Sequence, residues 1–444
     1  MPGGGSHAQS GDRGSGRDLP LLIEHGIVIA APGEQAPIID GVVVIRGTRI
    51  EWVGPAGDYP GTGEPASRID AASCAVLPGL VDTHAHFRGF RALGDGLGFP
   101  AWHDRYVHQF AERMTPDDAY YGAVNTFMEM LRNGITTVQG MSGITVVEDS
   151  EIRAALDSGI RARIVPHIHE RGDVEATIER IEAEQSAGAD RVRTWLGVEV
   201  PQLAGLATLR RIADAAEQLN VYVHTHFSEV SHDSVGQLSQ AGLIRRGLSL
   251  AHCVHLDDDD IALFARTGVS VAHNPRSNSR FGNGIAPLRR LLDAGVRVGL
   301  GTDAPDSTFS CDLLAEAQAA ALLARAIGRD PRALSSGEAL RLATSGGAAA
   351  VGMDDEVGRL LPGARADIIV VDLSGPSTTP VLTRLPHENV LPLILFGAVG
   401  RDVRDVLVDG QVVLRDRAFT QLDGDQVVAE CQRRAERILD QIPG

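Results

Sequence analysis

The stretch from Leu248 to Asp306 constrains the fold more than any other part of the sequence. It contains three short apolar runs that each end in residues able to bind a metal or move a proton: Leu248–Ala251 before His252, Val269–Ala272 before His273, and Val296–Gly301 before Thr302 and Asp303. The segments between the runs, Asp259–Thr267 and Ile285–Ala294, have the 3.6-residue apolar spacing of helices. Alternating strands and helices predict a parallel sheet, and in a (β/α)8 barrel the catalytic groups follow the strands. The stretch therefore predicts part of a barrel that carries a metal-type site.

Five further strand candidates come earlier in the chain: Val76–His86, Thr136–Gln139, Arg163–His169, Val192–Val200 and Val221–His226. Helical segments separate them, among them Asp117–Asn133, Asp149–Ser158 and Ala207–Leu219. Together these elements give eight strands over about 270 residues, close to the ~250 residues of a TIM barrel. We therefore predict an α/β fold with a (β/α)8 TIM barrel over residues 76–352.

The two ends of the chain share a sequence pattern that differs from that of the barrel segments. Short β-type runs broken by Gly and Pro fill residues 19–75 and return in residues 353–422. We expect them to form one small β-sandwich domain built from both chain ends. Residues 1–18 are rich in Gly and Ser and are predicted to be a disordered tail, whereas residues 423–444 are predicted to hold a closing amphipathic helix.

Composition excludes several classes of function. The chain has 444 residues, of which 43% are apolar and 22% charged, and no apolar run approaches the ~20 residues of a membrane span. The beginning of the sequence has no apolar signal region, so a cytoplasmic location is expected. The net charge of −17 argues against nucleic acid and anionic membranes as partners. All 41 Lys+Arg residues are arginines, so a Schiff-base lysine and a carboxylated lysine that bridges two metals are both excluded.

Two strand ends carry paired histidines. His84 and His86 follow the first barrel strand, and residues two apart in a strand point to the same side, so both imidazoles can face the barrel mouth. The fifth strand ends in His224 and His226, of which His226 is the expected ligand, whereas His224 is either a direct participant or a buried supporting histidine. Glu229 follows three residues later, where a carboxylate near metal-activated water is a natural proton carrier.

The last strands complete the predicted metal set. Asp303 adds an anionic oxygen to the three histidines, and three histidines with one carboxylate suit a catalytic Zn²⁺ or Fe²⁺. We expect one divalent metal, zinc ahead of iron. His252 is expected to be a second, non-ligand histidine that hydrogen-bonds the attacking water or the substrate. His255, one turn further on, has a weaker claim to a direct role.

The motifs PGLVDTHAHF, HTHFSE, AHCVHL, AHNPRSNSRFGNGIAP and GTDAPD together resemble the amidohydrolase superfamily over about residues 20–420. Within it, the chain looks like the branch of triazine chlorohydrolases and of deaminases acting on adenosine derivatives, guanine and related heterocycles. The resemblance implies that His84, His86, His226 and Asp303 bind one metal. It also implies that Glu229 and His252 handle protons with Asp303, and that the protein is a homodimer or a larger homo-oligomer.

Two departures from the family pattern bear on the substrate. Adenosine-type members carry an acidic residue that holds the ribose hydroxyls, two positions before a Trp. Here Pro100 occupies the position of the acidic residue, and the Trp is present as Trp102. The family's histidine after the fourth strand corresponds to Glu199, which either accepts hydrogen bonds from the substrate or forms a salt bridge with an arginine. We predict Phe99, Trp102, His169, Glu199 and Asn278 as substrate-binding residues.

Three other polar motifs are less specific. His167 and His169 are expected to be pocket lining, chiefly His169, or structural. The run Asp257–Asp260 is expected at a helix N-terminus, where negative charge is favoured. Arg276, Asn278 and Arg280 follow the seventh strand and are candidates for positioning the substrate, and Asn278 could equally well hold the loop together.

The sequence thus predicts a metal-dependent hydrolase that deaminates an amino-substituted nitrogen heterocycle of the purine, pterin or triazine kind. A metal-bound hydroxide would attack the ring carbon while Glu229 protonates the adjacent ring nitrogen. The alternatives are dechlorination or C–N cleavage on a triazine-like ring, hydrolysis of a formimino group or cyclic amide, and a non-catalytic scaffold. Retention of all four ligands and Glu229 argues against the scaffold.

Overall fold

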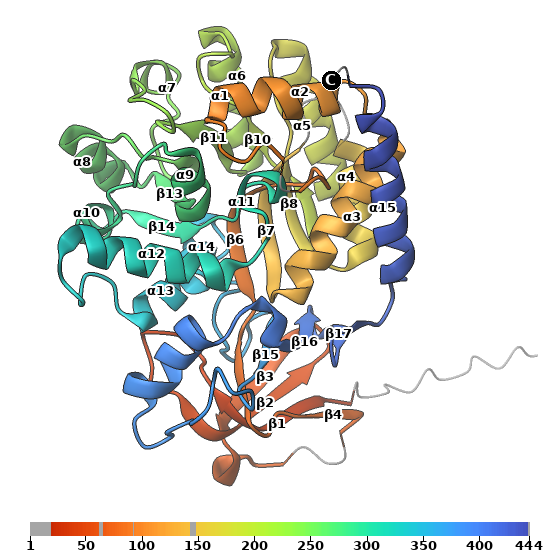
Figure 1. Cartoon of the computed structure of the whole chain (residues 1–444), viewed down its shortest axis with the longest axis vertical. Helices are drawn as coiled ribbons and strands as arrows, with labels where there is room; N and C mark the ends of the chain where they lie inside the picture. The colour runs from red at the N-terminus through yellow and green to blue at the C-terminus, as the bar shows by residue number, and fades with distance from the viewer. Residues whose placement is uncertain (1–18, 62–64, 92, 143–147, 443–444) are drawn as a thin grey trace, which may run out of the picture.

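The structure is a computed structural model of the chain, and it describes residues 19–61, 65–91, 93–142 and 148–442. The predicted tail, residues 1–18, lies outside this range. A barrel of strands and helices stands on a smaller β domain, and the β domain lies at the end of the barrel where its strands begin (Figure 1). The predicted site residues follow the strands and therefore lie at the opposite end.

The barrel strands are all paired in parallel: β6 (Leu80–His86), β7 (Ile135–Met141), β8 (Arg161–Val165), β9 (Val192–Thr194), β10 (Leu196–Gly197), β11 (Val223–Phe227), β12 (Leu248–His252), β13 (Ser270–His273) and β14 (Arg297–Leu300). The Trp195 N–H donates to the Ile164 carbonyl oxygen at 2.9 Å, so β9 and β10 continue as one barrel strand. A parallel bridge between Ala85 and Asp303 closes the ring. The predicted (β/α)8 barrel is confirmed.

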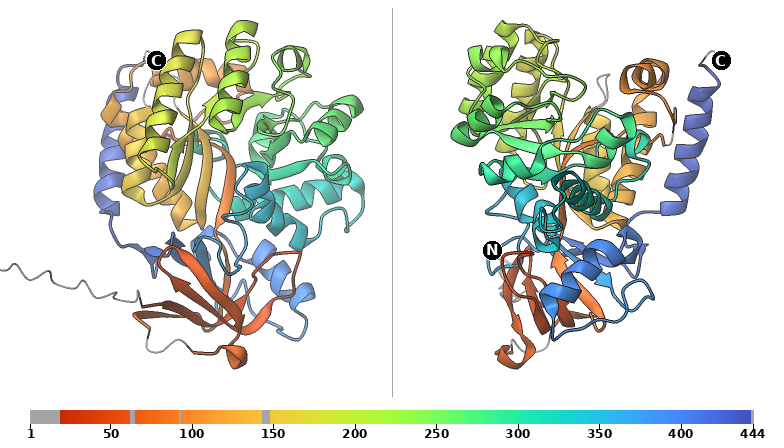
Figure 2. Two further views of the ribbon diagram at one scale, coloured as in Figure 1. Left: turned by 180° about the vertical axis from the view of Figure 1, so that it is seen from behind. Right: turned by 60° about the vertical axis from the view of Figure 1, so that its left-hand side comes forward.

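The helices surround the strands (Figure 2, left). They are α1 (Phe99–Trp102), α2 (His108–Ala111), α3 (Pro116–Arg132), α4 (Glu148–Ser158), α5 (Arg171–Ser186), α6 (Leu206–Leu219), α7 (Gly236–Gln240), α8 (Asp258–Thr267), α9 (Pro275–Phe281), α10 (Leu288–Asp293), α11 (Pro305–Thr308), α12 (Leu313–Gly328), α13 (Ser336–Leu342), α14 (Ser345–Ala350) and α15 (Gly424–Leu439). The acidic run Asp257–Asp260 begins α8, because Asp257 and Asp260 form a reciprocal capping box there. That prediction is confirmed.

Both chain ends build one nine-stranded sheet, as expected for a domain completed by the two termini. Its strands are β1 (Leu21–Val28), β2 (Ile38–Arg46), β3 (Arg49–Pro55), β4 (Ser67–Asp70), β5 (Cys74–Pro78), β15 (Ile368–Asp372), β16 (Val403–Val408), β17 (Gln411–Arg415) and β18 (Ala418–Phe419). The first half of β1 pairs with β4 and its second half with β5. β5 then pairs with β15, which brings the C-terminal strands into the same sheet.

The predicted first barrel strand, Val76–His86, is wrong as a single element. The structure divides it at Gly79: β5 belongs to the β domain, and only β6 enters the barrel. A side chain at Gly79 would place its Cβ 2.0 Å from the Thr136 hydroxyl oxygen, so only glycine fits at this crossing. The apolar run continues across the break because both halves are buried.

Buried ion pairs and a helix hold the parts together. The guanidinium of Arg161, at the start of β8, donates to both carboxylate oxygens of Asp367 beside β15, at 2.9 and 3.1 Å. α15 runs along the outside of the barrel next to α3 (Figure 2, right). There Arg434 and Arg437 contact the buried carboxylate of Asp118 in the first turn of α3.

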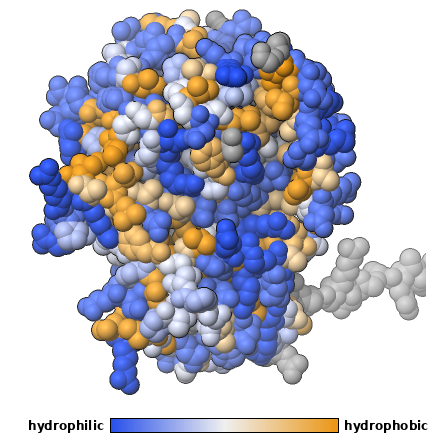
Figure 3. Space-filling view, viewed as in Figure 1, coloured by the Kyte–Doolittle hydropathy of each residue, from blue (hydrophilic) through white to orange (hydrophobic). Residues whose placement is uncertain are grey.

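The outer surface is mostly hydrophilic on the face that Figure 3 shows, with apolar side chains gathered on the left side of the barrel. Figure 1 places α12 on that side, and Leu322 and Ile327 are exposed on this helix. Among the described residues, no helix is long and apolar enough to cross a membrane.

Candidate metal centre and active site

Five polar side chains converge where the barrel strands end: His84 and His86 from β6, His226 from β11, His252 from β12, and Asp303 after β14. Nε2 of His86 lies 3.3 Å from Nε2 of His226. Oδ1 of Asp303 lies 3.7 Å from Nε2 of both His84 and His86. The four ligand residues predicted from the sequence are thus brought together, and the mouth of the barrel is the place where a cation could bind.

The donor atoms of this cluster fit a divalent metal. Nε2 of His84 is buried and has no hydrogen-bond partner among the described residues, which is costly for a polar atom unless something binds it. Burial lowers the pKa of His84 and of His86 well below the ordinary value, so both imidazoles are neutral and offer lone pairs. Three neutral imidazoles and one carboxylate form a donor set that suits zinc.

A chain of hydrogen bonds fixes the orientation of His84. Nδ1 of His84 lies 2.9 Å from Nε2 of His224, and Nδ1 of His224 lies 3.1 Å from the Ser249 carbonyl oxygen. The side-chain nitrogen of Gln139 also lies 3.0 Å from this Nδ1, but its N–H groups have the Thr83 carbonyl oxygen and the Ser249 hydroxyl as acceptors at 2.9 and 3.3 Å. Since the Ser249 carbonyl can only accept, we assign the His224 proton to Nδ1, so that Nε2 accepts the Nδ1–H of His84. This assignment leaves Nε2 of His84 unprotonated toward the cluster. His224 therefore supports His84 from behind, the second of its two predicted roles.

His226 and Asp303 are also held by neighbours. Nδ1 of His226 donates to the Glu199 carbonyl oxygen at 2.7 Å, which leaves its Nε2 free to face the cluster. The Ser277 hydroxyl donates to Oδ2 of Asp303, so Oδ1 faces the histidines. Asp303 has a φ of 58°, a left-handed conformation that is strained for a non-glycine residue. The fold thus imposes the direction of this carboxylate.

Glu229 and His252 face each other beside the cluster. Oε2 of Glu229 lies 3.7 Å from Nε2 of His252, and Oε1 accepts a hydrogen bond from the Asn283 side-chain amide at 3.0 Å. Burial, followed by the nearby charge of Asp303, raises the pKa of Glu229 to about 8. Nδ1 of His252 donates to Oδ1 of Asn278 at 2.9 Å, so its Nε2 carries the lone pair. One proton donor and one acceptor therefore stand side by side.

A cavity of about 210 Å³ opens over the cluster. Its lining residues are His86, Arg88, Phe99, Trp102, His103, His167, Glu199, Val200, His226, Glu229, His252 and Asp303. This volume is below the roughly 300–1,000 Å³ of pockets for drug-sized ligands, so the cavity suits a small molecule. α1 and α2 lie across this end of the barrel (Figure 1).

The structure places the predicted substrate-binding residues in two groups. Phe99, Trp102 and Glu199 line the cavity. His169 is exposed and is not among the residues that line the cavity, whereas His167 lines it. The substrate contact of His169 stays a prediction. Pro100 is exposed on the first turn of α1 and does not border the cavity either.

Asn278 and its neighbours in α9 hold the loop rather than line the cavity. Asn278 is buried and hydrogen-bonds His252, and it is not among the residues that line the cavity, so its substrate contact stays a prediction. Arg276 donates to the Thr308 carbonyl oxygen at 2.8 Å, and Arg280 donates to the Leu93 carbonyl oxygen at 2.8 Å. These bonds tie α9 to the end of α11 and to the loop that follows β6.

Sequence reasoning missed Arg88 and His103, and it gave His167 too little weight. Arg88 stands two residues after His86, and this spacing was the available signal. His103 begins the π-helical turn His103–Val107 directly after α1, in the connection between β6 and α3, whose path no local pattern predicts. The supporting contacts of Ser277 and Asn283 depend on the same tertiary packing.

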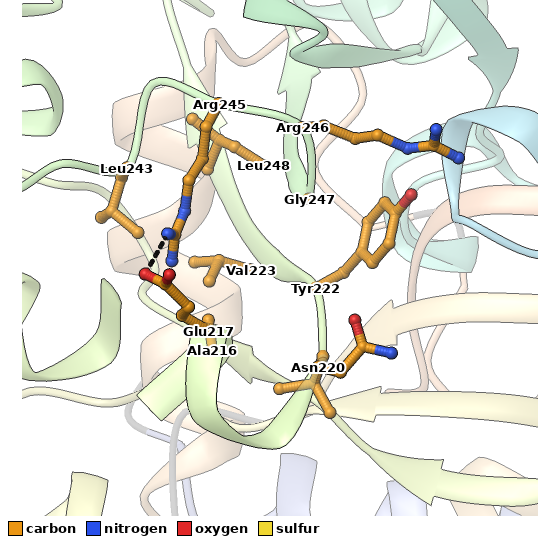
Figure 4. Close-up of a pocket in the computed structure, with 11 residues that line it drawn as sticks. Ala216, Glu217, Asn220, Tyr222, Val223, Leu243, Arg245, Arg246, Gly247 and Leu248 are labelled. Carbon is orange, nitrogen blue, oxygen red and sulfur yellow. Dashed lines mark hydrogen bonds and ion pairs between the residues drawn. The ribbon is translucent and has the colours of Figure 1, made fainter. Parts of the chain in front are cut away.

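A second cavity, of about 290 Å³, lies at the other end of the barrel, between the starts of β11 and β12 (Figure 4). The Arg245 guanidinium donates to the Glu217 carboxylate across it at 2.7 Å. No histidine or aspartate is among the described residues that line it, so it offers no metal cluster. Its size alone does not make it the active site.

Comparison with known proteins agrees with this geometry. The amidohydrolase family matches residues 75–413 of the chain. A 5-methylthioadenosine/S-adenosylhomocysteine deaminase of Desulforudis audaxviator is 34% identical over 96% of this chain and 100% of its own length. A zinc-bound adenosine deaminase structure from Xanthomonas campestris has a TM-score of 0.87 at 28% identity, covering 95% of this chain and 98% of that one.

A zinc-containing atrazine chlorohydrolase structure from Arthrobacter aurescens has a TM-score of 0.85 at 26% identity, covering 93% of this chain and 99% of that one. The resemblance found in the motifs therefore extends over nearly the whole chain. The chain belongs to the amidohydrolase family and is a hydrolase of carbon–nitrogen bonds other than peptide bonds.

Proposed function

We propose that the protein is a divalent-metal-dependent deaminase that hydrolyses the exocyclic amino group of a nitrogen heterocycle of the purine, pterin or triazine kind. The observation that carries this proposal is Glu229, which is buried in the cavity, held by Asn283 and set opposite His252 beside the ligand cluster. Relatives named as deaminases of 5-methylthioadenosine, S-adenosylhomocysteine and 5′-deoxyadenosine support it.

We assign one metal to His84, His86, His226 and Asp303. Zinc is preferred over iron because both solved structures described above contain zinc. A divalent cation at this place supplies Lewis-acid activation of water, whose pKa falls from 15.7 toward ~7. The remaining chemistry rests on side chains of this chain.

Three side chains then share the proton transfers. Glu229, whose pKa burial raises to about 8, donates a proton to the ring nitrogen next to the amino-bearing carbon. The lone pair on Nε2 of His252 accepts a hydrogen bond from the attacking water and so directs its oxygen. The Asp303 carboxylate takes one proton from the water and passes it to the departing amine, and the remaining hydroxyl proton of the tetrahedral adduct returns to Glu229. The products are ammonia and the corresponding oxo heterocycle.

The test uses protein whose metal content has been measured and follows the release of ammonia from each of a panel of substrates. The panel holds guanine, 8-oxoguanine, adenosine, thiomethyladenosine, cytosine, melamine and an aminopterin. Glu229→Gln should keep its metal but lose roughly 10²–10⁴-fold in rate, the usual contribution of a general acid. Glu217→Gln, the same substitution at the second cavity, is the matched control and should leave the rate unchanged. Full activity of Glu229→Gln would remove Glu229 from the mechanism.

A chloro-substituted triazine belongs in the same panel, because the atrazine chlorohydrolase structure shares this fold over nearly the full chain. Chloride release without ammonia from any amine would assign the same site to dechlorination. Silence toward amines and chlorides, with one metal per chain, would direct the search to formimino compounds and cyclic amides.

A further inference from the structure

Arg88 occupies an unusual place for an arginine. It follows the ligand His86 by two residues, its side chain is only 8% exposed, and it borders the cavity. Its Nε and Nη2 atoms donate to the two carboxylate oxygens of the buried Asp306, at 3.2 and 3.4 Å. Asp306 follows Asp303 by three residues. The ion pair between Arg88 and Asp306 therefore also links the segments that follow the first and eighth barrel strands.

The ion pair with Asp306 engages only the Nε and Nη2 groups of the Arg88 guanidinium. A guanidinium carries five N–H groups, and no residue in the described part of the chain accepts from Nη1 of Arg88. Its carbon atom Cζ lies 6.0 Å from the centre of the Trp102 ring, which covers this side of the cavity. A donor beside an apolar wall needs an acceptor from the cavity itself, which is solvent in the free protein and a ligand in the complex.

Two further groups in the cavity, the Glu199 carboxylate and the His167 imidazole, have no hydrogen-bond partner among the described residues. The carboxylate of Glu199 lies 3.9 Å from Nε2 of His103 and 3.9 Å from Nδ1 of His167, and no described arginine lies within ion-pair distance of it. The salt bridge considered as the alternative for Glu199 is therefore absent from the described residues. His167 is buried, and neither of its ring nitrogens has a hydrogen-bond partner there. The cavity thus presents the Nη1 donor of Arg88, the carboxylate acceptor of Glu199 and the imidazole of His167, each without a hydrogen-bond partner in the described part of the chain.

We propose, on the basis of the deaminase function above, that the substrate carries a ring carbonyl next to a ring N–H, as in an oxo-substituted amino heterocycle. Arg88 donates to the carbonyl oxygen, and the Glu199 carboxylate accepts the neighbouring N–H. The neutral imidazole of His167 completes this polar wall. Adenine derivatives have no such edge, so this recognition would separate the chain from relatives named for adenosine derivatives.

The test compares two ligands that differ in this edge: guanine, which has the carbonyl and N–H, and 2-aminopurine, which has neither. Binding to zinc-loaded Glu229→Gln protein is measured by calorimetry, so that turnover does not interfere. Guanine should bind at least tenfold more tightly, a difference of about 1.36 kcal/mol. Equal affinities, or no binding of either ligand, would overturn the proposal.

Two variants test whether Arg88 and Glu199 are the residues that recognise the carbonyl and N–H groups of the ligand. Adding Arg88→Met together with Asp306→Asn removes the donor without leaving a buried unpaired carboxylate, and should reduce the preference for guanine to within about threefold. Adding Glu199→Gln instead should also reduce the preference for guanine. This second variant provides the deciding measurement in the event that the first variant loses its fold or its zinc. A preference that survives both changes refutes the assignment.

Ammonia release by the wild-type protein is scored separately. Tight guanine binding without ammonia from any amine would refute deamination yet support recognition by Arg88. Ammonia release from adenosine together with equal affinity for the two purines would support deamination and refute this recognition.

Discussion

Replacing His224 tests how the ligand cluster is oriented. His224 is fully buried and accepts the Nδ1–H of His84 at 2.9 Å, while its own Nδ1–H is satisfied by the Ser249 carbonyl oxygen. His224→Phe keeps the ring volume but leaves a buried N–H on His84 without an acceptor, which costs about 1–3 kcal/mol. Loss of such a supporting partner typically weakens metal affinity 10–100-fold.

The assay is competition for zinc with a calibrated chelator, on folded apo-protein. His224→Phe should lower the zinc affinity by about 10–100-fold, whereas His224→Gln, whose amide oxygen can accept the His84 proton, should recover a large part of the loss. Ser249→Ala is the matched control, since it removes the hydroxyl oxygen that lies 3.2 Å from Nδ1 of His224 but keeps the carbonyl that accepts its proton. Unchanged affinity in His224→Phe would refute the assigned tautomers and the supporting role.

Two further predictions concern pH and stability. Because the proton on Glu229 is donated, kcat should fall as pH rises through the pKa of this group, at or below about 8 once a cation lies nearby, and Glu229→Gln should lack this limb in a pH–rate series. Arg161→Met should reduce the free energy of unfolding in urea by about 3–5 kcal/mol, because the buried Asp367 loses its partner, while Arg161→Met with Asp367→Leu should recover much of it. A urea midpoint that does not move would mean that this pair does not join the barrel to the β domain.

Much of the site was predictable because its ligands stand at the ends of barrel strands or directly after them. The spacing of His84 and His86 fixes a shared side of β6, and residues that follow parallel strands meet at one end of a barrel. The geometry brings together all four predicted ligands with Glu229 and His252. Their roles as ligands and proton carriers stay predictions until the measurements above are made.

The rest depended on tertiary contacts. Whether His224 binds a metal or a neighbour depends on which ring atom faces which partner, and Arg88 enters the cavity through its pairing with Asp306, more than 200 residues away. His169 lies outside the cavity lining because β8 ends earlier than its apolar run suggested. The homo-oligomeric state, the cytoplasmic location and the domain boundaries also stay predictions.

The most direct test of the central claim is a zinc titration of apo-protein with ammonia release followed at each point. The account predicts that activity toward an amino heterocycle rises linearly with added zinc and stops at one equivalent per chain. Activity that survives complete removal of metal, or fully loaded protein that releases no ammonia from any amine in the panel, would contradict it.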